Sequence, residues 1–156
     1  MKYSNDEYQS LANELKIDRD SLDEECITQP NRFFHASEGY TLSVAAKDKK
    51  KLELELMTAK LDREIRDDLV ANKEKITDKI VEQEIIRDEQ YQRASREYIE
   101  ASLTSNRWNA LKEAYRQRAD MLKVLQSLHS SGYFGEITGA AERNDARRRF
   151  NDKRSV

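Results

Sequence analysis

Apolar residues recur at spacings of three, four and seven in two long stretches of the chain, which is the repeat of one helix face. The first stretch starts near Pro30 and carries two apolar sets, namely Leu52, Leu56, Ala59 and Leu54, Leu61, Ile65, Leu69. The second stretch extends to Leu128 and repeats the pattern at Ile80, Ile85, Tyr91, Ala94, Tyr98, Trp108, Leu111, Tyr115, Leu122 and Leu125. The short polar segment 71–77 separates them. The pattern predicts an all-α fold in which two long antiparallel helices form a hairpin.

Polar residues mark further boundaries. Thr77 before an acidic residue predicts the start of a helix, and a bend is expected near Asp88 or at 104–106. Pro30 after a polar pair predicts an early position in the first long helix. The chain then divides into an acidic helical segment 1–29, the hairpin 30–134 and a basic tail 135–156.

The N-terminal segment is expected to hold a short helix capped by Ser4 or Asn5 and a second short helical piece over 18–26. The first of these has one apolar side, made of Tyr8, Leu11 and Leu15. Aromatic residues at the start of the hairpin should pack against these helices or against a neighbouring subunit; they are Phe33, Phe34 and Tyr40.

The amino-acid composition indicates that the predicted hairpin has a binding partner. Hydrophobic residues make up 37% of the 156 residues and charged residues also 37%, where about a quarter charged is usual. A rod with so few apolar residues leaves an apolar stripe that a partner or a copy of itself must cover. We therefore expect a homo-oligomer.

The net charge of -2 conceals a gradient. Residues 1–29 carry three basic and eight acidic side chains, whereas residues 139–156 carry six basic and three acidic ones. This gradient is compatible with polyanion binding by one end, with head-to-tail contact between chains, or with solvation alone.

The sequence also indicates a compartment. The single Cys26 excludes an internal disulfide and suits a reducing interior. Neither a secretion signal nor a window of about 20 apolar residues is present. We expect a cytoplasmic protein (in the host cytoplasm if a phage encodes it) with no membrane association.

Cations follow one another along the first arm of the hairpin. This basic line comprises Lys47, Lys50, Lys51, Lys60, Arg63 and Arg66, and the tail adds Arg147, Arg148 and Arg149. Two interpretations stay open for the line, a solvated helix face with interleaved acids or a path for a nucleic-acid backbone. The tail is either a flexible solubilising segment or one that orders on meeting nucleic acid.

Catalytic chemistry is not indicated. The four glycines do not form a phosphate-binding loop. His35, His129 and Cys26 offer neither a nucleophile–base pair nor a zinc site. Trp108 could stack a base, but its spacing to the next apolar residues favours packing. No catalytic residue, cofactor or metal is predicted, and a non-enzymatic binding protein is expected.

Residues from about Phe34 to Tyr133 resemble the phage recombination mediators of the UvsY family. The shared features are an aromatic-rich start of the first long helix, a lysine- and leucine-rich arm, a polar connector, a threonine-capped isoleucine block, and a long helix with Trp108 three residues before leucine. The family carries a basic Lys-Ala-Arg-Leu-Asp segment implicated in DNA binding. Here Thr58-Ala59-Lys60-Leu61-Asp62 occupies the corresponding place, and Lys60 keeps the second charge.

The resemblance implies a ring of roughly six to eight copies that gathers many weak phosphate contacts. Such a ring would bind single-stranded DNA and help a RecA-like recombinase displace a single-strand-binding protein during DNA recombination, repair and replication. The residues leave a second hypothesis open, a coiled-coil structural or assembly protein of a phage particle without a DNA role. A third is an adaptor whose acidic head occupies a basic partner.

Overall fold

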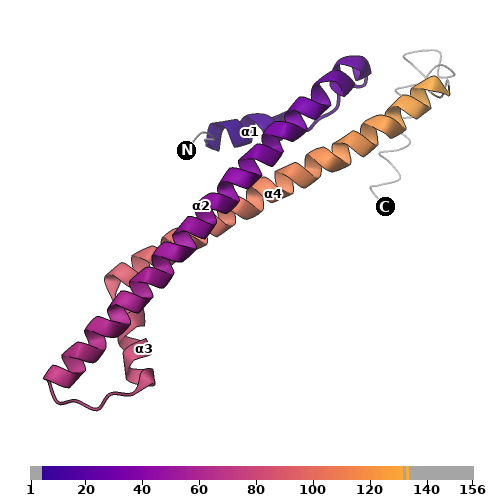
Figure 1. Ribbon diagram of the computed structural model, residues 1–156. Coiled ribbons are helices and arrows are strands. Elements are labelled where there is room, and N and C mark those ends of the chain that lie inside the picture. Colours follow the sequence, from indigo (N-terminus) through magenta and orange to yellow (C-terminus); the bar gives the residue numbers. More distant parts are fainter. Residues whose placement is uncertain (1–4, 132, 134–156) are drawn as a thin grey trace, which may run out of the picture.

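The computed structural model describes residues 5–131 and 133, and every regular element in those ranges is an α-helix. The helices are α1 (Asn5–Asn13), α2 (Leu22–Ala71), α3 (Asp78–Arg87) and α4 (Glu89–Ser130). The long helices α2 and α4 lie side by side, with α1 near one end of the pair and α3 at the other (Figure 1). The predicted all-α helical hairpin is confirmed. Within the described part of the chain, no helix is both long and apolar enough to cross a membrane.

The turn that closes the hairpin has the predicted cap. Lys73 adopts a left-handed backbone conformation with a φ of 59° just after α2 ends. Thr77 then accepts a hydrogen bond through Oγ1 from the amide of Ile80 at 3.3 Å. This bond satisfies one of the free amides in the first turn of α3, so Thr77 is its N-cap.

The second arm bends at Asp88, one of the two predicted places. The backbone of Asp88 is extended, which ends α3 and starts α4. Its Oδ1 accepts hydrogen bonds from the amides of Gln90 (2.7 Å) and Tyr91 (3.0 Å). Residues 104–106, the alternative place, lie in unbroken helix.

An apolar cluster joins α2 to α3 beside the turn, and we call it the loop-end cluster. Its buried members are Leu61, Leu69, Val81 and Ile85. Val81 and Ile85 of the second arm therefore pack against the end of the first arm. Of the two apolar sets on α2, the one that contains Leu61 and Leu69 faces the hairpin.

A second cluster fills the space between α1, α2 and α4 at the opposite end, and we call it the open-end cluster. Its buried members are Ala36, Trp108, Leu111 and Tyr115, with the half-buried Tyr8, Leu11, Ala12, Leu15 and Tyr40 around them. Trp108 is only 4% exposed and meets the ring of Tyr8 edge-on at 5.3 Å. The predicted packing role of Trp108 is confirmed.

The Trp108 ring lies directly on the backbone of α2 at Gly39. A Cβ atom at position 39 would stand 2.4 Å from both Cε3 and Cζ3 of the indole. Any residue other than glycine would therefore collide with the ring in its present place. This close approach explains why a glycine interrupts a long helix, where it costs about 1 kcal/mol relative to alanine.

A buried polar network lies beside the open-end cluster and ties three segments together. Arg118 on α4 donates hydrogen bonds to the Glu25 carboxylate, to Gln29 Oε1 at 2.5 Å and to the carbonyl oxygen of Leu15 at 3.2 Å. Gln29 Nε2 in turn donates to the carbonyl oxygen of Tyr115 at 2.7 Å. The Arg118 side chain is only 2% exposed. These hydrogen bonds offset the free-energy cost of removing its charge from water.

The network also changes the acidity of Glu25. Burial by itself would raise the pKa of this carboxyl, but hydrogen bonds from the Asp18 amide, Arg118 and Arg32 lower the pKa to about 2. The Asp18 bond measures 3.0 Å and the Arg32 bond 2.6 Å. Glu25 is therefore ionised throughout the neutral range and holds two guanidinium groups together.

The prediction of a separate short helix over 18–26, with Pro30 near the start of the next helix, is wrong. α2 begins at Leu22 and Pro30 lies inside it. A proline in a helix interior removes one hydrogen bond and costs about 3 kcal/mol. Glu25 and Gln29, in the turns just before it, are fixed by the polar network, which holds this part of the helix in place. The boundary between segments 1–29 and 30–134 thus falls within one helix, and the tail 135–156 lies outside the described residues.

The aromatic residues at positions 33, 34 and 40 behave differently from one another. Tyr40 packs against the open-end cluster, as predicted. Phe33 and Phe34 are 37% and 60% exposed, so they do not form the expected packing against the N-terminal helices. Contact between these two rings and a neighbouring subunit stays a prediction.

Candidate nucleic-acid interface

The described cations of the basic line all lie on α2, but they do not form one stripe. Lys47, Lys50 and Lys51 share one side of the helix. At about 100° per residue, Lys60 lies about 140° around the helix from Lys47, and Arg63 lies about 160° from it. The spacing of three holds within each group of cations. The nine positions from Lys51 to Lys60, however, place the second group on a different side of the helix from the first. Arg147, Arg148 and Arg149 lie outside the described residues.

Two of these cations are each held by two carboxylates. Lys50 Nζ lies 2.7 Å from both Glu53 and Glu97, so it bridges α2 and α4. Hydrogen bonds to these two acids raise the pKa of Lys50. Arg66 contacts Asp62 at 3.0 Å and Asp78 at 2.8 Å, and these bonds raise the pKa of its guanidinium. Both side chains therefore link α2 to the second arm of the hairpin.

The other four cations make longer contacts with single acids. The distances are 3.7 Å for Lys47, Lys51 and Lys60, and 3.9 Å for Arg63. Exposed pairs of this kind contribute roughly 0–1 kcal/mol. Each of these cations can therefore exchange its carboxylate for a phosphate at little cost.

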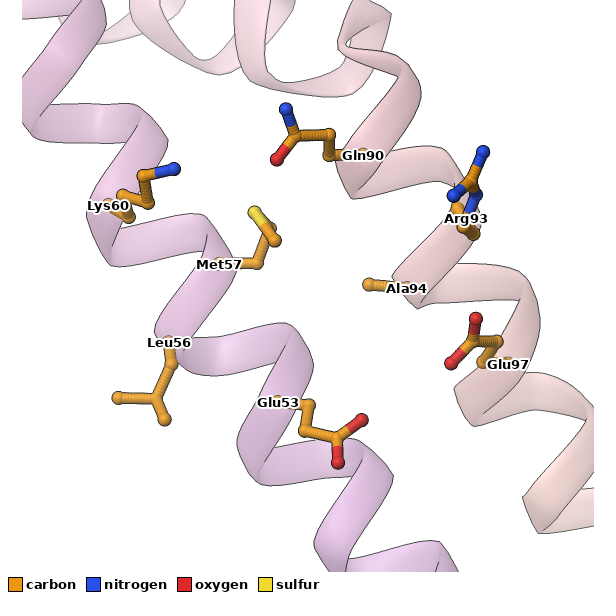
Figure 2. Close-up of a pocket in the computed structure, with 8 residues that line it drawn as sticks. All are labelled: Glu53, Leu56, Met57, Lys60, Gln90, Arg93, Ala94 and Glu97. Carbon is orange, nitrogen blue, oxygen red and sulfur yellow. The ribbon is translucent and has the colours of Figure 1, made fainter.

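Lys60 differs from the other three because it borders a groove between α2 and α4. The groove has a volume of about 540 Å³ and is lined by Glu53, Leu56, Met57, Lys60, Gln90, Arg93, Ala94 and Glu97. In Figure 2, Lys60 and Met57 on α2 point toward Gln90 on α4, and Leu56 points away from α4. The groove thus combines a lysine, an arginine and an amide with apolar Met57 and Ala94.

Lys50 gives the groove an asymmetric charge. Glu53 and Glu97 lie at one end, and Lys50 binds both of them. Hydrogen bonding to Lys50 also lowers the pKa of Glu53, so this end is a fixed ion cluster. The end with Lys60 and Arg93 therefore carries the exchangeable positive charge.

Arg93 is a candidate that the sequence interpretation missed. Among the described residues, it makes no ion pair, and the same holds for Arg96 and Arg107 on the same helix. Glu89 and Glu97 lie four residues before and four residues after Arg93 in the chain. Glu97, its i+4 neighbour, instead binds Lys50 from the other arm. Spacings of 3 and 11, which place all three arginines on one side of α4, could have revealed the set.

Within 5–131 and 133, no group of three or more His, Cys, Asp or Glu side chains could hold a metal ion. His35 lies beside the ring of Phe34, with the centroids 5.8 Å apart. No protein-family model, curated protein or solved structure matches the chain.

Proposed function

We propose that this protein binds single-stranded DNA as a non-enzymatic recombination mediator, which helps a RecA-like recombinase load onto DNA covered by a single-strand-binding protein. The observation that carries the proposal is the groove between α2 and α4, where Lys60 and Arg93 meet an apolar wall. Lys60 belongs to the segment that resembles the DNA-binding helix of the UvsY family. The partners, and a ring of six to eight copies, belong to the same proposal.

The groove offers the two kinds of contact that single strands need. Cations attract the phosphate backbone, and the release of counterions makes the affinity dependent on salt. Met57 and Ala94 supply apolar surface for bases without selecting a sequence, as expected of a protein that acts on any strand. One groove gives a weak contact, so several copies in one assembly would gain affinity by multivalency.

A binding titration tests this proposal. Anisotropy of a labelled single-stranded oligonucleotide, measured at several salt concentrations, should show affinity that falls steeply with salt. Replacing both groove cations (Lys60→Ala with Arg93→Ala) should weaken binding roughly tenfold or more and reduce the salt slope by about 2.

Lys51→Ala is the matched control. Lys51 lies on the same helix, is 59% exposed and contacts Glu55 at 3.7 Å, where Lys60 is 57% exposed and contacts Glu64 at 3.7 Å. Only Lys60 borders the groove. If Lys51→Ala weakens binding as much as Lys60→Ala, the whole basic line is the contact and the groove is not. If the wild-type chain does not bind at low salt, the DNA role is refuted.

A specific observation favours a second candidate, an assembly protein of a phage particle without a DNA role. Each of the six described cations of the basic line lies within 4 Å of a carboxylate. Charge paired in this way suits a solvated surface that forms protein contacts. Co-sedimentation with purified particles, together with no affinity for DNA, would select this candidate.

A further inference from the structure

The charged side chains that line the groove between α2 and α4 cancel one another. Lys60 and Arg93 carry two positive charges, and Glu53 and Glu97 carry two negative ones. From Glu53 to Lys60 the groove is about 10 Å long, which equals the Debye length of about 10 Å at 0.1 M ionic strength. The acids at one end therefore weaken the attraction of a phosphate to the cations. By themselves, these four side chains make a poor anion site.

Lys50 changes this balance from outside the groove. It is not one of the lining side chains, but its Nζ donates hydrogen bonds of 2.7 Å to Glu53 Oε2 on α2 and to Glu97 Oε2 on α4. These bonds raise the pKa of Lys50, so the ammonium group stays charged at neutral pH. With Lys50 included, the net charge of the groove is +1 instead of 0.

Lys50 also determines which cation Glu97 binds. Arg93 precedes Glu97 by four positions on α4, and an arginine and a glutamate at this spacing can form an ion pair on a helix surface. Within residues 5–131, however, Arg93 has no ion pair, and Glu97 binds Lys50 from the other arm. The Arg93 guanidinium is thereby left for another anion.

We propose that Lys50 is a positioning residue for single-stranded DNA: it holds Glu97 away from Arg93, so that the guanidinium is free to bind a phosphate of the strand. This inference rests on the proposed function. The basic line includes Lys50 as a direct phosphate contact, whereas in this proposal its role is indirect. The contact that joins α2 to α4 then also gives the groove its positive charge.

Two substitutions with opposite expected effects on DNA affinity test the role of Lys50. Lys50→Met lowers the net charge of the groove to 0 and releases Glu97 to Arg93. Affinity for a labelled single-stranded oligonucleotide should fall roughly fivefold at about 0.1 M salt, and the salt slope should fall by about 1. Glu97→Gln also breaks the ion pair between the arms, but it raises the net charge to +2, so binding should be tighter than in the wild type. A purely structural role of the ion pair predicts weaker binding in both variants, and that result would overturn the inference.

Three further variants serve as controls. The double variant Lys50→Met with Glu97→Gln has the wild-type net charge of +1 and no acid at position 97 for Arg93, so it should recover the lost affinity. Lys50→Arg keeps the charge and should bind like the wild type. Lys123→Met removes a positive charge elsewhere on α4, where Lys123 is 76% exposed and pairs with Asp120 at 3.1 Å, and should leave the affinity unchanged. No recovery in the double variant would overturn the inference.

An NMR measurement without DNA separates this inference from the proposed function. The Nε–H signal of Arg93, assigned by its loss in Arg93→Lys, should move in Lys50→Met as Glu97 pairs with the guanidinium. It should return toward its wild-type position when Glu97→Gln is added. An unchanged signal in Lys50→Met would overturn the inference even if the groove binds DNA. A wild-type chain that does not bind DNA would refute the proposed function, and the NMR signal would still decide whether Lys50 keeps Glu97 from Arg93.

Discussion

Replacing Gly39 with alanine adds one methyl group at the tightest contact between α2 and α4. Two effects oppose each other. In a helix interior, alanine is favoured over glycine by about 1 kcal/mol, so local propensity alone predicts a more stable protein. The structure predicts the opposite, because the new Cβ would lie 2.4 Å from two carbons and 2.8 Å from a third carbon of the Trp108 indole.

The size of the effect follows from how little the ring can move. Normal contacts need a separation of 3.4–4 Å, so the indole must retreat by roughly 1 Å. It is 4% exposed and surrounded by Tyr8, Ala36, Leu111 and Tyr115. Overpacking in such a core costs about 1–3 kcal/mol, and a rigid ring against a helix backbone belongs at the upper end. We expect a net loss of about 2 kcal/mol after the propensity gain, or roughly 4–8 °C in Tm.

Urea unfolding followed by circular dichroism measures this change. Trp108 is the only tryptophan in the chain, so its emission reports the displaced ring directly and should shift to the red. Ala110→Gly, at an exposed position in α4, calibrates the propensity effect in the same chain. In the Gly39→Ala background, Trp108→Leu should recover part of the loss, because the smaller side chain leaves room for the methyl group. A Gly39→Ala protein as stable as the wild type would refute the reasoning.

Two further predictions concern single polar side chains. Because the pKa of Glu25 falls from 4.5 to about 2 on folding, its contribution to the free energy of unfolding is complete above pH 4.5 and is lost as the pH falls to 2; the difference is about 3 kcal/mol. Glu25→Gln should lower stability at pH 7 and flatten the acid limb of Tm against pH, whereas Glu24→Gln, on the exposed side of the same turn, should leave the limb unchanged. Thr77→Ala removes the N-cap of α3 and should cost about 1 kcal/mol in urea unfolding. Thr104→Ala, whose hydroxyl bonds only to its own helix, should cost nothing, and equal losses for the two threonine variants would exclude the capping role.

The sequence predicted those features that depend on neighbouring residues. The cap at Thr77 and the bend at Asp88 follow from side chains that bond amides two or three residues ahead. The loop-end cluster follows from the isoleucine block and the spacing of Leu61 and Leu69. These contacts are local, so the pattern of the chain was enough.

Features that depend on distant residues were not predictable in this way. The helix continues through Pro30 because the preceding turns are fixed by Arg118, 89 and 93 positions away in the chain. The importance of Gly39 depends on the Trp108 ring, which no local pattern places above it. The groove was missed for the same reason, since Lys60 and Arg93 line one groove only after both arms are in place.

Glu25 and Gln29 are far along the chain from their hydrogen-bond partners on α4, and this distance affects the order in which the protein folds during translation. While the ribosome is still producing the second arm, α1 and the first turns of α2 lack their partners on α4, because the carbonyl of Tyr115 and the guanidinium of Arg118 are not yet made. The turn at 72–77 and the cluster beside it need only short-range contacts, and loops that close over short distances form first. We therefore expect folding of the nascent hairpin to begin at its turn and to proceed toward its termini. The acidic head would be the last part to be secured, although it is the first part to be translated.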